Sequence, residues 1–202
     1  MRAAPAAAPA PWPEAGGDPD LVDVAAARAD RAAFATLYRR YLERVYGYCF
    51  YQLGDHHDAE DATERTFMAA LRGLDGFEDL GSTFRAWLFR IARNTVANAH
   101  RTRRRRRTEP LPDSFERPAP NADPARLVAL ADELHEVRRA IGHMPEDRRQ
   151  VILLRFVDGL STAEVATVLE RSPGAVRVLL HRALRDLATR LGGTGETLPP
   201  GM

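Results

Sequence analysis

The sequence predicts an all-α protein made of two small helical domains that are joined by a flexible linker. Apolar residues recur every three or four positions over most of the chain, and no alternating strand pattern of any length occurs. Residues 108–124 contain five prolines and almost no apolar periodicity, which is typical of a linker. The 202 residues are enough for two small cores.

The first helical region follows residues 1–19, which are rich in alanine and proline and are expected to be disordered. That start has no apolar segment of the kind a secretion signal needs, and no stretch is long enough to span a membrane. A helical pattern runs from about residue 21 to residue 52. Its apolar face consists of Phe34, Leu37, Tyr41, Val45 and Cys49. Cys49 is the single cysteine, so no internal disulfide can form. We expect Cys49 to be a buried core residue, and the lack of a disulfide fits a reducing cytoplasm.

Two further helices complete the first domain, residues 20–107. Gly54 ends the preceding helix and Asp55 caps the next, which runs to about Leu74. Its predicted core face comprises Ala59, Ala62, Thr66, Ala69 and Ala70, with Phe67 and Leu71 beside it. After a loop at residues 75–82, Thr83 caps a long helix that continues through Ala99 into an arginine run. We expect that helix to bury Phe84, Leu88, Ile91 and Thr95.

The second domain, residues 125–191, contains four helical patterns at 125–142, 145–158, 161–170 and 173–191, and a tail expected to be disordered follows at 192–202. Ser161 caps the third pattern with Glu164 three residues on, and Pro173 stands at the first position of the fourth. The last helix has the inward stripe Val176, Leu180, Ala183 and Leu187. Its outward side carries Arg177, His181, Arg182 and Arg185. The pair predicts a helix-turn-helix whose second helix presents arginines to a major groove; a plain helical hairpin is the alternative.

Two adjacent segments of opposite charge in the first domain indicate two different binding partners. Residues 83–107 hold nine arginines and no acid, whereas residues 55–79 hold eight acids and two arginines. On the arginine-rich helix one face combines an aromatic, two amides and two arginines, namely Trp87, Arg90, Asn94, Asn98 and Arg101. Such a face suits DNA, because arginines neutralise phosphates, amides read base edges and an aromatic stacks on an unpaired base. The alternative is that Trp87 is a core residue and the arginines are merely solvated.

The acidic helix favours a docking face for a basic partner, with plain solvation as the alternative. Asp58, Asp61 and Glu64 share one side of the helix at spacings of three. Clustered carboxylates also bind metals, but no second acidic cluster with histidine occurs, and the adjacent His56 and His57 do not face each other on a helix. No catalytic motif is present. We therefore expect no metal, no cofactor and no enzymatic activity.

Four segments in this order resemble the sigma-70 superfamily, specifically its minimal extracytoplasmic-function group. They are FATLYRRYLERVYGYC, DAEDATERTFMAAL, STFRAWLFRIARNTVANAHR and MPEDRRQVILLRFVDGLSTAEVATVLERSPGAVRVLLHRAL, which lie within residues 34–107 and 144–191. The resemblance implies sigma domain 2, the linker and sigma domain 4. It implies a cytoplasmic protein that joins RNA polymerase on the nucleoid.

The resemblance also implies a role for each surface. The acidic helix, through Asp58, Asp61, Glu64 and Phe67, would dock on the clamp helices of the largest subunit of core RNA polymerase, and the second domain would contact the flap region. The −10 promoter element would be recognised and melted by Phe77, Ser82, Trp87, Arg90, Asn94, Asn98 and Arg101, with one flipped base between the loop at 77–82 and Asn94. The −35 element would be read by Arg171, Ser172, Gly174, Arg177, Val178, His181 and Arg182. An anti-sigma partner is common in the group.

Three departures from the family pattern bear on these roles. Ala62-Thr63 replaces an apolar pair followed by Gln, Ala175 stands where Thr is common, and Val178-Leu179 stands where Ser-Arg is usual. The −35 sequence that better-known members read therefore cannot be assigned to this protein. The apolar pair at 178–179 could instead contact the neighbouring polymerase surface. The competing functions are a dimeric helix-turn-helix repressor or activator, which needs no acidic helix, and, more distantly, a metal-dependent nuclease.

Overall fold

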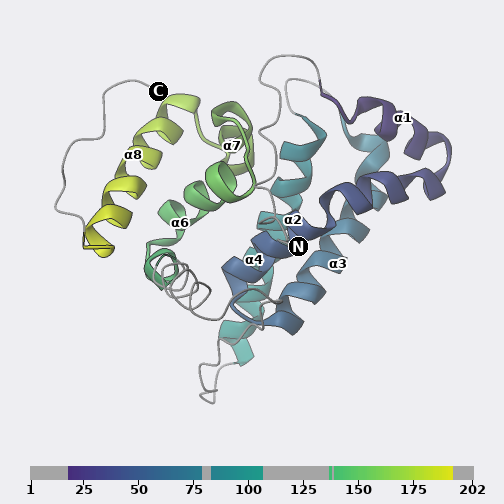
Figure 1. Cartoon of the computed structure of the whole chain (residues 1–202). Helices are drawn as coiled ribbons and strands as arrows, with labels where there is room; N and C mark the ends of the chain where they lie inside the picture. Colours follow the sequence, from purple (N-terminus) through teal and green to yellow (C-terminus); the bar gives the residue numbers. More distant parts are fainter. Residues whose placement is uncertain (1–17, 79–82, 107–136, 138, 193–202) are drawn as a thin grey trace, which may run out of the picture.

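The computed structural model describes residues 18–78, 83–106, 137 and 139–192, and all regular secondary structure in these ranges is helical, as the sequence predicts (Figure 1). None of the described helices has the length and apolar character needed to cross a membrane. The elements are, in chain order, α1 (Leu21–Ala29), η1 (Arg31–Ala33), α2 (Phe34–Leu53), α3 (His56–Gly73), η2 (Leu74–Gly76), α4 (Phe84–Arg106), α6 (Glu146–Ile152), the π-helical η3 (Leu153–Val157), α7 (Thr162–Leu169) and α8 (Pro173–Arg190).

Local residues fix the end of α1, the end of α2 and the start of α3. Asp30 has an extended backbone and its carboxylate accepts a hydrogen bond from the N–H of Ala32 at 2.9 Å, so the helical pattern expected to be continuous from residue 21 is broken there. Gly54 ends α2 with a φ of 70°, a conformation that costs glycine little. Asp55 caps α3, as the sequence predicts, by accepting from the N–H of Asp58 at 2.9 Å.

The N-terminal module, the described residues from 18 to 106, packs α2, α3 and α4 around buried aromatic rings. Its start is held by Asp18, which accepts hydrogen bonds from the N–H groups of Asp20 (3.0 Å) and of Phe84, and by Asp20, which accepts from the buried Tyr41 hydroxyl. Asp18 and Pro19 were expected to be disordered, but the structure describes both, and the hydrogen bond from Phe84 fastens Asp18 to α4. Residues 1–17 and the predicted linker at 108–124 lie outside the described ranges.

The C-terminal module, the described residues from 137 to 192, contains the helix-turn-helix. Ser161 and Glu164 form the capping box at the start of α7. Glu170 ends α7 in the left-handed region, with a φ of 55°, and Ser172 then caps α8 by accepting from the N–H of Ala175 at 3.2 Å, ahead of Pro173. The turn between the two helices is therefore set by local residues, as the sequence indicates.

The inward stripe of α8 differs from the predicted one. Val176, Leu179 and Ala183 are buried, whereas Leu180 is only partly buried. The expectation that Val178 and Leu179 form an exposed pair is wrong for Leu179, because α8 is rotated so that this side chain packs toward α6 and α7. Val178 alone remains on the surface, with 53% of its area exposed.

The two modules pack side by side instead of standing apart (Figure 1). Helix α7 packs on α4, and η3 approaches α2. Buried apolar side chains of both modules belong to one continuous cluster. This packing was not predicted from the sequence.

Candidate nucleic-acid and protein interfaces

The acidic surface of α3 lies open to solvent. Asp61 and Glu64 are exposed and Asp58 is half-buried, so the three carboxylates predicted for docking lie on the outer side of the helix. Asp61 pairs with Arg65, one turn further on, at 2.7 Å, and Asp58 lies 4.0 Å from Arg103 of α4. Exposed pairs of this kind hold a carboxylate only weakly, which leaves it available to a basic partner.

Phe67, the fourth residue predicted for docking, is buried. Its ring packs edge-on against Tyr38, with centroids 4.7 Å apart, and against Phe34 at 6.5 Å. Tyr38 and Met68 are large apolar residues that remain 40% and 46% exposed on α2 and α3. Sequence reasoning missed both, because the helical periodicity that identifies a core stripe says nothing about which apolar residues at its edge stay uncovered. Phe67 therefore supports the surface from beneath, and Tyr38 and Met68 contribute to it.

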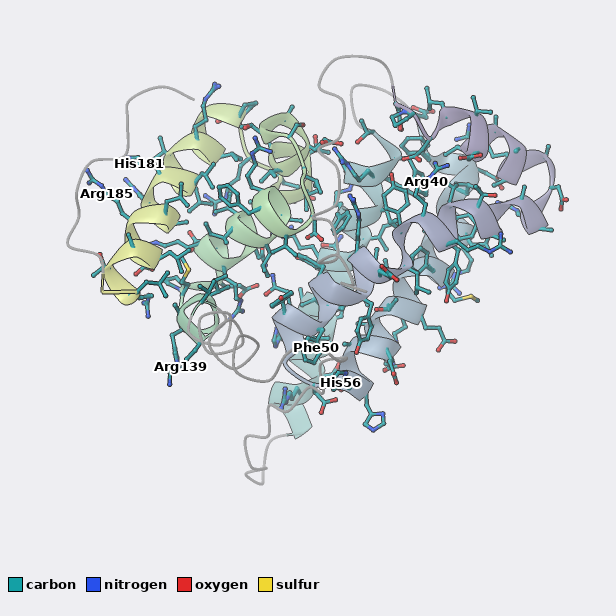
Figure 2. The ribbon with its side chains drawn as sticks, viewed as in Figure 1. Arg40, Phe50, His56, Arg139, His181 and Arg185 are labelled. Carbon is teal, nitrogen blue, oxygen red and sulfur yellow. The ribbon has the colours of Figure 1, made fainter. Side chains whose placement is uncertain are left out.

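The two adjacent histidines have different surroundings. The Nδ1 atom of His56 lies 2.6 Å from the Tyr46 hydroxyl, and its ring centroid lies 4.5 Å from that of Phe50, which Figure 2 shows beside it. His57 is exposed and its Nδ1 atom lies 3.9 Å from a Glu60 oxygen. Within the described ranges no three His, Cys, Asp or Glu side chains are grouped as metal ligands would be. His56 thus packs against the aromatic side chains of α2, whereas His57 points into solvent.

The proposed DNA face of α4 is divided between core and surface. Asn94, Asn98 and Arg101 are exposed, with Arg101 donating a hydrogen bond to Asn98, and Arg90 is half-buried. The buried side of the helix comprises Phe84, Arg85, Ala86, Leu88, Phe89, Ala92 and Val96, whereas Ile91 and Thr95, which were expected to point inward, are only partly covered.

Trp87 lies at the boundary between these two sides. Its ring centroid lies 5.3 Å from that of Phe77 and 5.6 Å from that of Phe84, and a Cβ at Gly73 would come within 3.4 Å of its six-membered ring. Phe77 is buried, so it supports the tryptophan from below. Ser82, the remaining residue of the predicted −10 site, lies outside the described ranges. The half-buried indole thus has a packing role while part of it stays accessible.

The outward face of the helix-turn-helix is basic and accessible. All seven residues predicted for −35 reading are exposed: Arg171, Ser172, Gly174, Arg177, Val178, His181 and Arg182. Figure 2 shows His181 and Arg185 projecting from α8 away from the rest of the molecule. The Ser172 hydroxyl caps α8, whereas the side chains of Arg177, His181 and Arg182 make no hydrogen bond or ion pair with other described residues. This face therefore carries hydrogen-bond donors that the other described residues do not use.

Comparison with known proteins matches both modules to described families. Residues 37–106 match the family model of sigma-70 region 2, and residues 134–187 match that of sigma-70, region 4. The chain is 34% identical to the ECF RNA polymerase sigma factor BldN of Streptomyces coelicolor, over 85% of this chain and 65% of that protein. It is 31% identical to the ECF RNA polymerase sigma factor SigD of Mycobacterium tuberculosis, over 88% of this chain and 85% of that one.

A solved structure of similar fold is that of CnrH in complex with the cytosolic domain of CnrY. The similarity has a TM-score of 0.66 at 28% sequence identity, and it covers 88% of this chain and 100% of CnrH. The match therefore extends over both modules of the fold.

Proposed function

The chain belongs to the sigma-70 family, among relatives of the extracytoplasmic-function group, and we propose that it binds core RNA polymerase and directs transcription initiation at specific promoters. Members of this family are transcription regulators and not enzymes. The observation that carries the proposal is the pairing, in one chain, of an exposed acidic α3 surface with an accessible basic face on α8. A protein that only binds duplex DNA needs the second surface but not the first.

In this proposal the basic face of α8 reads the −35 element. Arg177 lies in the first half of the helix and reaches base edges, while Arg182, five residues on, contacts a base or a phosphate. Arginine donates two parallel hydrogen bonds to guanine, and such a contact contributes about 1–3 kcal/mol of discrimination. Val178 takes the place of a polar residue on the exposed side and favours an apolar contact, such as a thymine methyl group.

The exposed side of α4 would handle the −10 element. Asn94 and Asn98 offer amide groups to base edges, and Arg90 and Arg101 neutralise phosphates. The accessible part of Trp87 stacks on an unpaired base, which contributes about 1–3 kcal/mol per base. Because Phe77 is buried beneath the tryptophan, its contribution is to hold that ring in place.

The acidic surface of α3 would dock on the clamp helices of the largest polymerase subunit. Asp61 and Glu64 supply charge and the exposed Met68 and Tyr38 supply apolar area beside them. This combination fits a basic helical partner better than a purely charged patch, because apolar contact gives affinity while charge gives orientation and rate. The C-terminal module would contact the flap region, and the protein would act on the nucleoid, where polymerase and promoters are.

An anti-sigma factor is the further partner that this proposal includes. CnrH is a relative of the same fold that was solved with the cytosolic domain of CnrY. A helical partner that covers the acidic surface of α3 would compete directly with core polymerase. The competing function, a stand-alone helix-turn-helix repressor or activator, predicts duplex binding without polymerase.

Reconstitution tests the proposal directly. The purified chain is passed over a size-exclusion column with core RNA polymerase, and the mixture is then used for run-off transcription on a library of promoter fragments. We expect co-elution and discrete transcripts that depend on the chain. Failure to co-elute, together with tight binding of a duplex operator by a dimer of the chain, would establish the repressor function instead.

A further inference from the structure

The chain on either side of residues 79–82 is held at two points by side chains of α1 and of the residues just before it. Arg28 of α1 donates from Nε to the carbonyl of Leu74 at 3.1 Å and from Nη2 to the carbonyl of Phe77. Asp18 accepts a hydrogen bond from the N–H of Phe84, the first residue of α4. These bonds fix where the chain leaves η2 and where it enters α4.

The bonds of Arg28 set the path of the chain at the end of η2. The Leu74 carbonyl also accepts from the N–H of Phe77 at 3.2 Å, and η2 ends there. One guanidinium therefore holds both carbonyls of this turn. Because the nitrogen atoms of a guanidinium are fixed in one plane, two such bonds restrict the position and the orientation of the backbone together.

Asp18 has the corresponding role at the start of α4. The N–H groups in the first turn of a helix have no partner within the helix, and a carboxylate beside them is also favoured by the helix dipole. Asp18 accepts from Phe84, while the Thr83 hydroxyl accepts from the N–H of Ala86 at 3.2 Å. The other carboxylate oxygen of Asp18 accepts from the N–H of Asp20 at 3.0 Å. One side chain thus joins the start of α1 to the start of α4.

Helix α1 is itself fixed on α2. Asp20, at its N-terminus, is only 1% exposed and accepts hydrogen bonds from Arg40 and from the buried Tyr41 hydroxyl. Arg40 also pairs with Asp23 of α1 at 2.6 Å, and Val24 of α1 is buried. The supports at Arg28 and Asp18 therefore have a fixed base in the N-terminal module.

The two supported backbone points carry the rings on which Trp87 rests. Phe77 and Phe84 pack edge to face, with centroids 5.8 Å apart, and Trp87 lies 5.3 Å from the first and 5.6 Å from the second. Both phenylalanine rings are buried, whereas the indole is half-buried. The position of the accessible indole surface therefore depends on the backbone that Arg28 and Asp18 hold.

We propose that Arg28 and Asp18 are positioning residues for −10 recognition, an inference that rests on the proposed function. In this role they contact no base. They hold Phe77 and the first turn of α4, and through them Trp87, in the geometry that accepts an unpaired base. A site discriminates between ligands only when its groups are held within about 0.5 Å of the productive geometry, so release of either support should weaken the preference for one base over another. Both residues precede residues 37–106, the part of the chain that matches sigma-70 region 2.

Arg31 provides a matched control. It lies on η1, directly after α1, and it also donates to a backbone carbonyl, that of Leu71, at 3.2 Å, and pairs with Asp75 at 2.5 Å. These bonds reach α3 and η2 ahead of the backbone of Phe77. Arg31→Ala therefore removes an arginine with similar bonds from the same part of the module and leaves the supports of Phe77 and Phe84 in place.

Base preference during transcription is the first test. The full chain and core RNA polymerase transcribe a library of promoters in which every −10 position is varied, at a temperature at which urea unfolding shows each variant to be folded. Arg28→Ala and Asp18→Ala should reduce discrimination at one or more −10 positions about fivefold or more, the size of one lost base contact. Arg31→Ala should keep the profile of the unmodified chain. Arg28→Lys keeps a charged donor and Asp18→Asn keeps an acceptor oxygen, so both should recover part of the discrimination.

Fluorescence of Trp87 tests the positioning without polymerase or DNA. The chain has two tryptophans, so Trp12→Phe leaves Trp87 as the single emitter. In this background Arg28→Ala and Asp18→Ala should shift the emission to longer wavelength and raise its quenching by acrylamide. Arg31→Ala should leave both quantities unchanged.

The outcomes separate positioning from a purely structural role. An unchanged base profile in folded Arg28→Ala and Asp18→Ala overturns the proposal. A uniform fall in transcription that preserves the ranking of bases also overturns it, because loss of stability lowers the amount of active protein without altering its preference. Should an alanine variant not fold, Arg28→Lys or Asp18→Asn is judged by the same two outcomes. If the unmodified chain does not bind core polymerase, the proposed function fails and the fluorescence decides alone: an unchanged Trp87 signal then overturns the positioning.

Discussion

Replacing Trp87 by alanine separates the packing role of this residue from its proposed role in promoter melting. The indole contacts Phe77 and Phe84 at centroid distances of 5.3 and 5.6 Å, and it is partly exposed. Full burial of an aromatic side chain makes its replacement by alanine cost about 3–5 kcal/mol. Because part of the Trp87 ring remains in solvent, we expect a loss of about 2–3 kcal/mol in the free energy of unfolding.

Melting should be impaired beyond this loss of stability. Stacking on an unpaired base contributes about 1–3 kcal/mol, so open-complex formation by Trp87→Ala should fall about tenfold or more when the protein is folded. Trp87→Phe should recover most of the stability and part of the opening, since it keeps an aromatic face. Asn94 is exposed and makes no comparable packing contact, so Asn94→Ala should impair opening with little change in stability.

Two measurements decide the matter. Urea unfolding gives the stability of each variant, and permanganate footprinting of promoter complexes, at a temperature where every variant is folded, gives the extent of melting. Normal footprints with folded Trp87→Ala would refute the stacking role. If instead Trp87→Ala unfolds the N-terminal module while Trp87→Phe melts promoters normally, the indole acts only as a core side chain.

Four further changes have defined outcomes. The double variant Asp61→Lys, Glu64→Lys should weaken binding to core polymerase clearly. Each single variant should weaken it only mildly, because an exposed charge pair contributes about 0.2–1 kcal/mol. A pull-down in which the double variant binds normally refutes docking by α3. Arg177→Ala should flatten the preference at one −35 position and cost about 1–3 kcal/mol, so an unchanged preference in a promoter-library selection excludes α8 as the reader. Asp55→Ala should destabilise the chain by about 1 kcal/mol near neutral pH through loss of the α3 cap. The cap bond lowers the pKa of Asp55, so its contribution is present above the usual pKa and disappears as pH falls; urea midpoints of the two proteins that fail to converge in acid contradict this. Burial raises the pKa of Asp158 well above 3.8, outweighing the attraction of Arg44 and Arg85, so the packed arrangement favours the protonated carboxyl. The packing of the two modules is then strongest at low pH and weakens as pH rises toward the raised pKa. The distance between spin labels on Thr36→Cys of α2 and Thr189→Cys of α8 measures this packing, and Asp158→Asn should remove its pH dependence.

The fold class and most helix boundaries follow from local sequence. Gly54, Asp55, Thr83, Ser161 and Ser172 cap or end helices through bonds to residues at most four positions away, so the residues involved are adjacent in the sequence itself. The exposed basic face of α8 was predicted for the same reason, since helical spacing alone separates Arg177, His181 and Arg182 from the buried Val176 and Ala183. The break at Asp30 was missed, although its cap is equally local, because apolar periodicity continues across it.

Other features depended on tertiary contacts. Periodicity allows either Leu179 or Leu180 to complete the core stripe of α8, and only packing against α6 and α7 decides that Leu179 is buried. Helical spacing leaves open whether Trp87 stacks on DNA or packs in the core. Only the positions of Phe77 and Gly73 in the fold decide that its ring is half-buried.

The association of the two modules was decided by tertiary structure alone. Glu164 is recognisable in the sequence as part of a capping box, but its second role joins it to Arg85, 79 residues earlier in the chain. Nothing in the pattern around either residue specifies the other, because an ion pair needs only opposite charge and proximity, and proximity over that separation is set by the packing of α4 on α7. The sequence by itself therefore determined the helices and their chemical faces, whereas the three-dimensional packing decided which of those faces are covered by the chain itself.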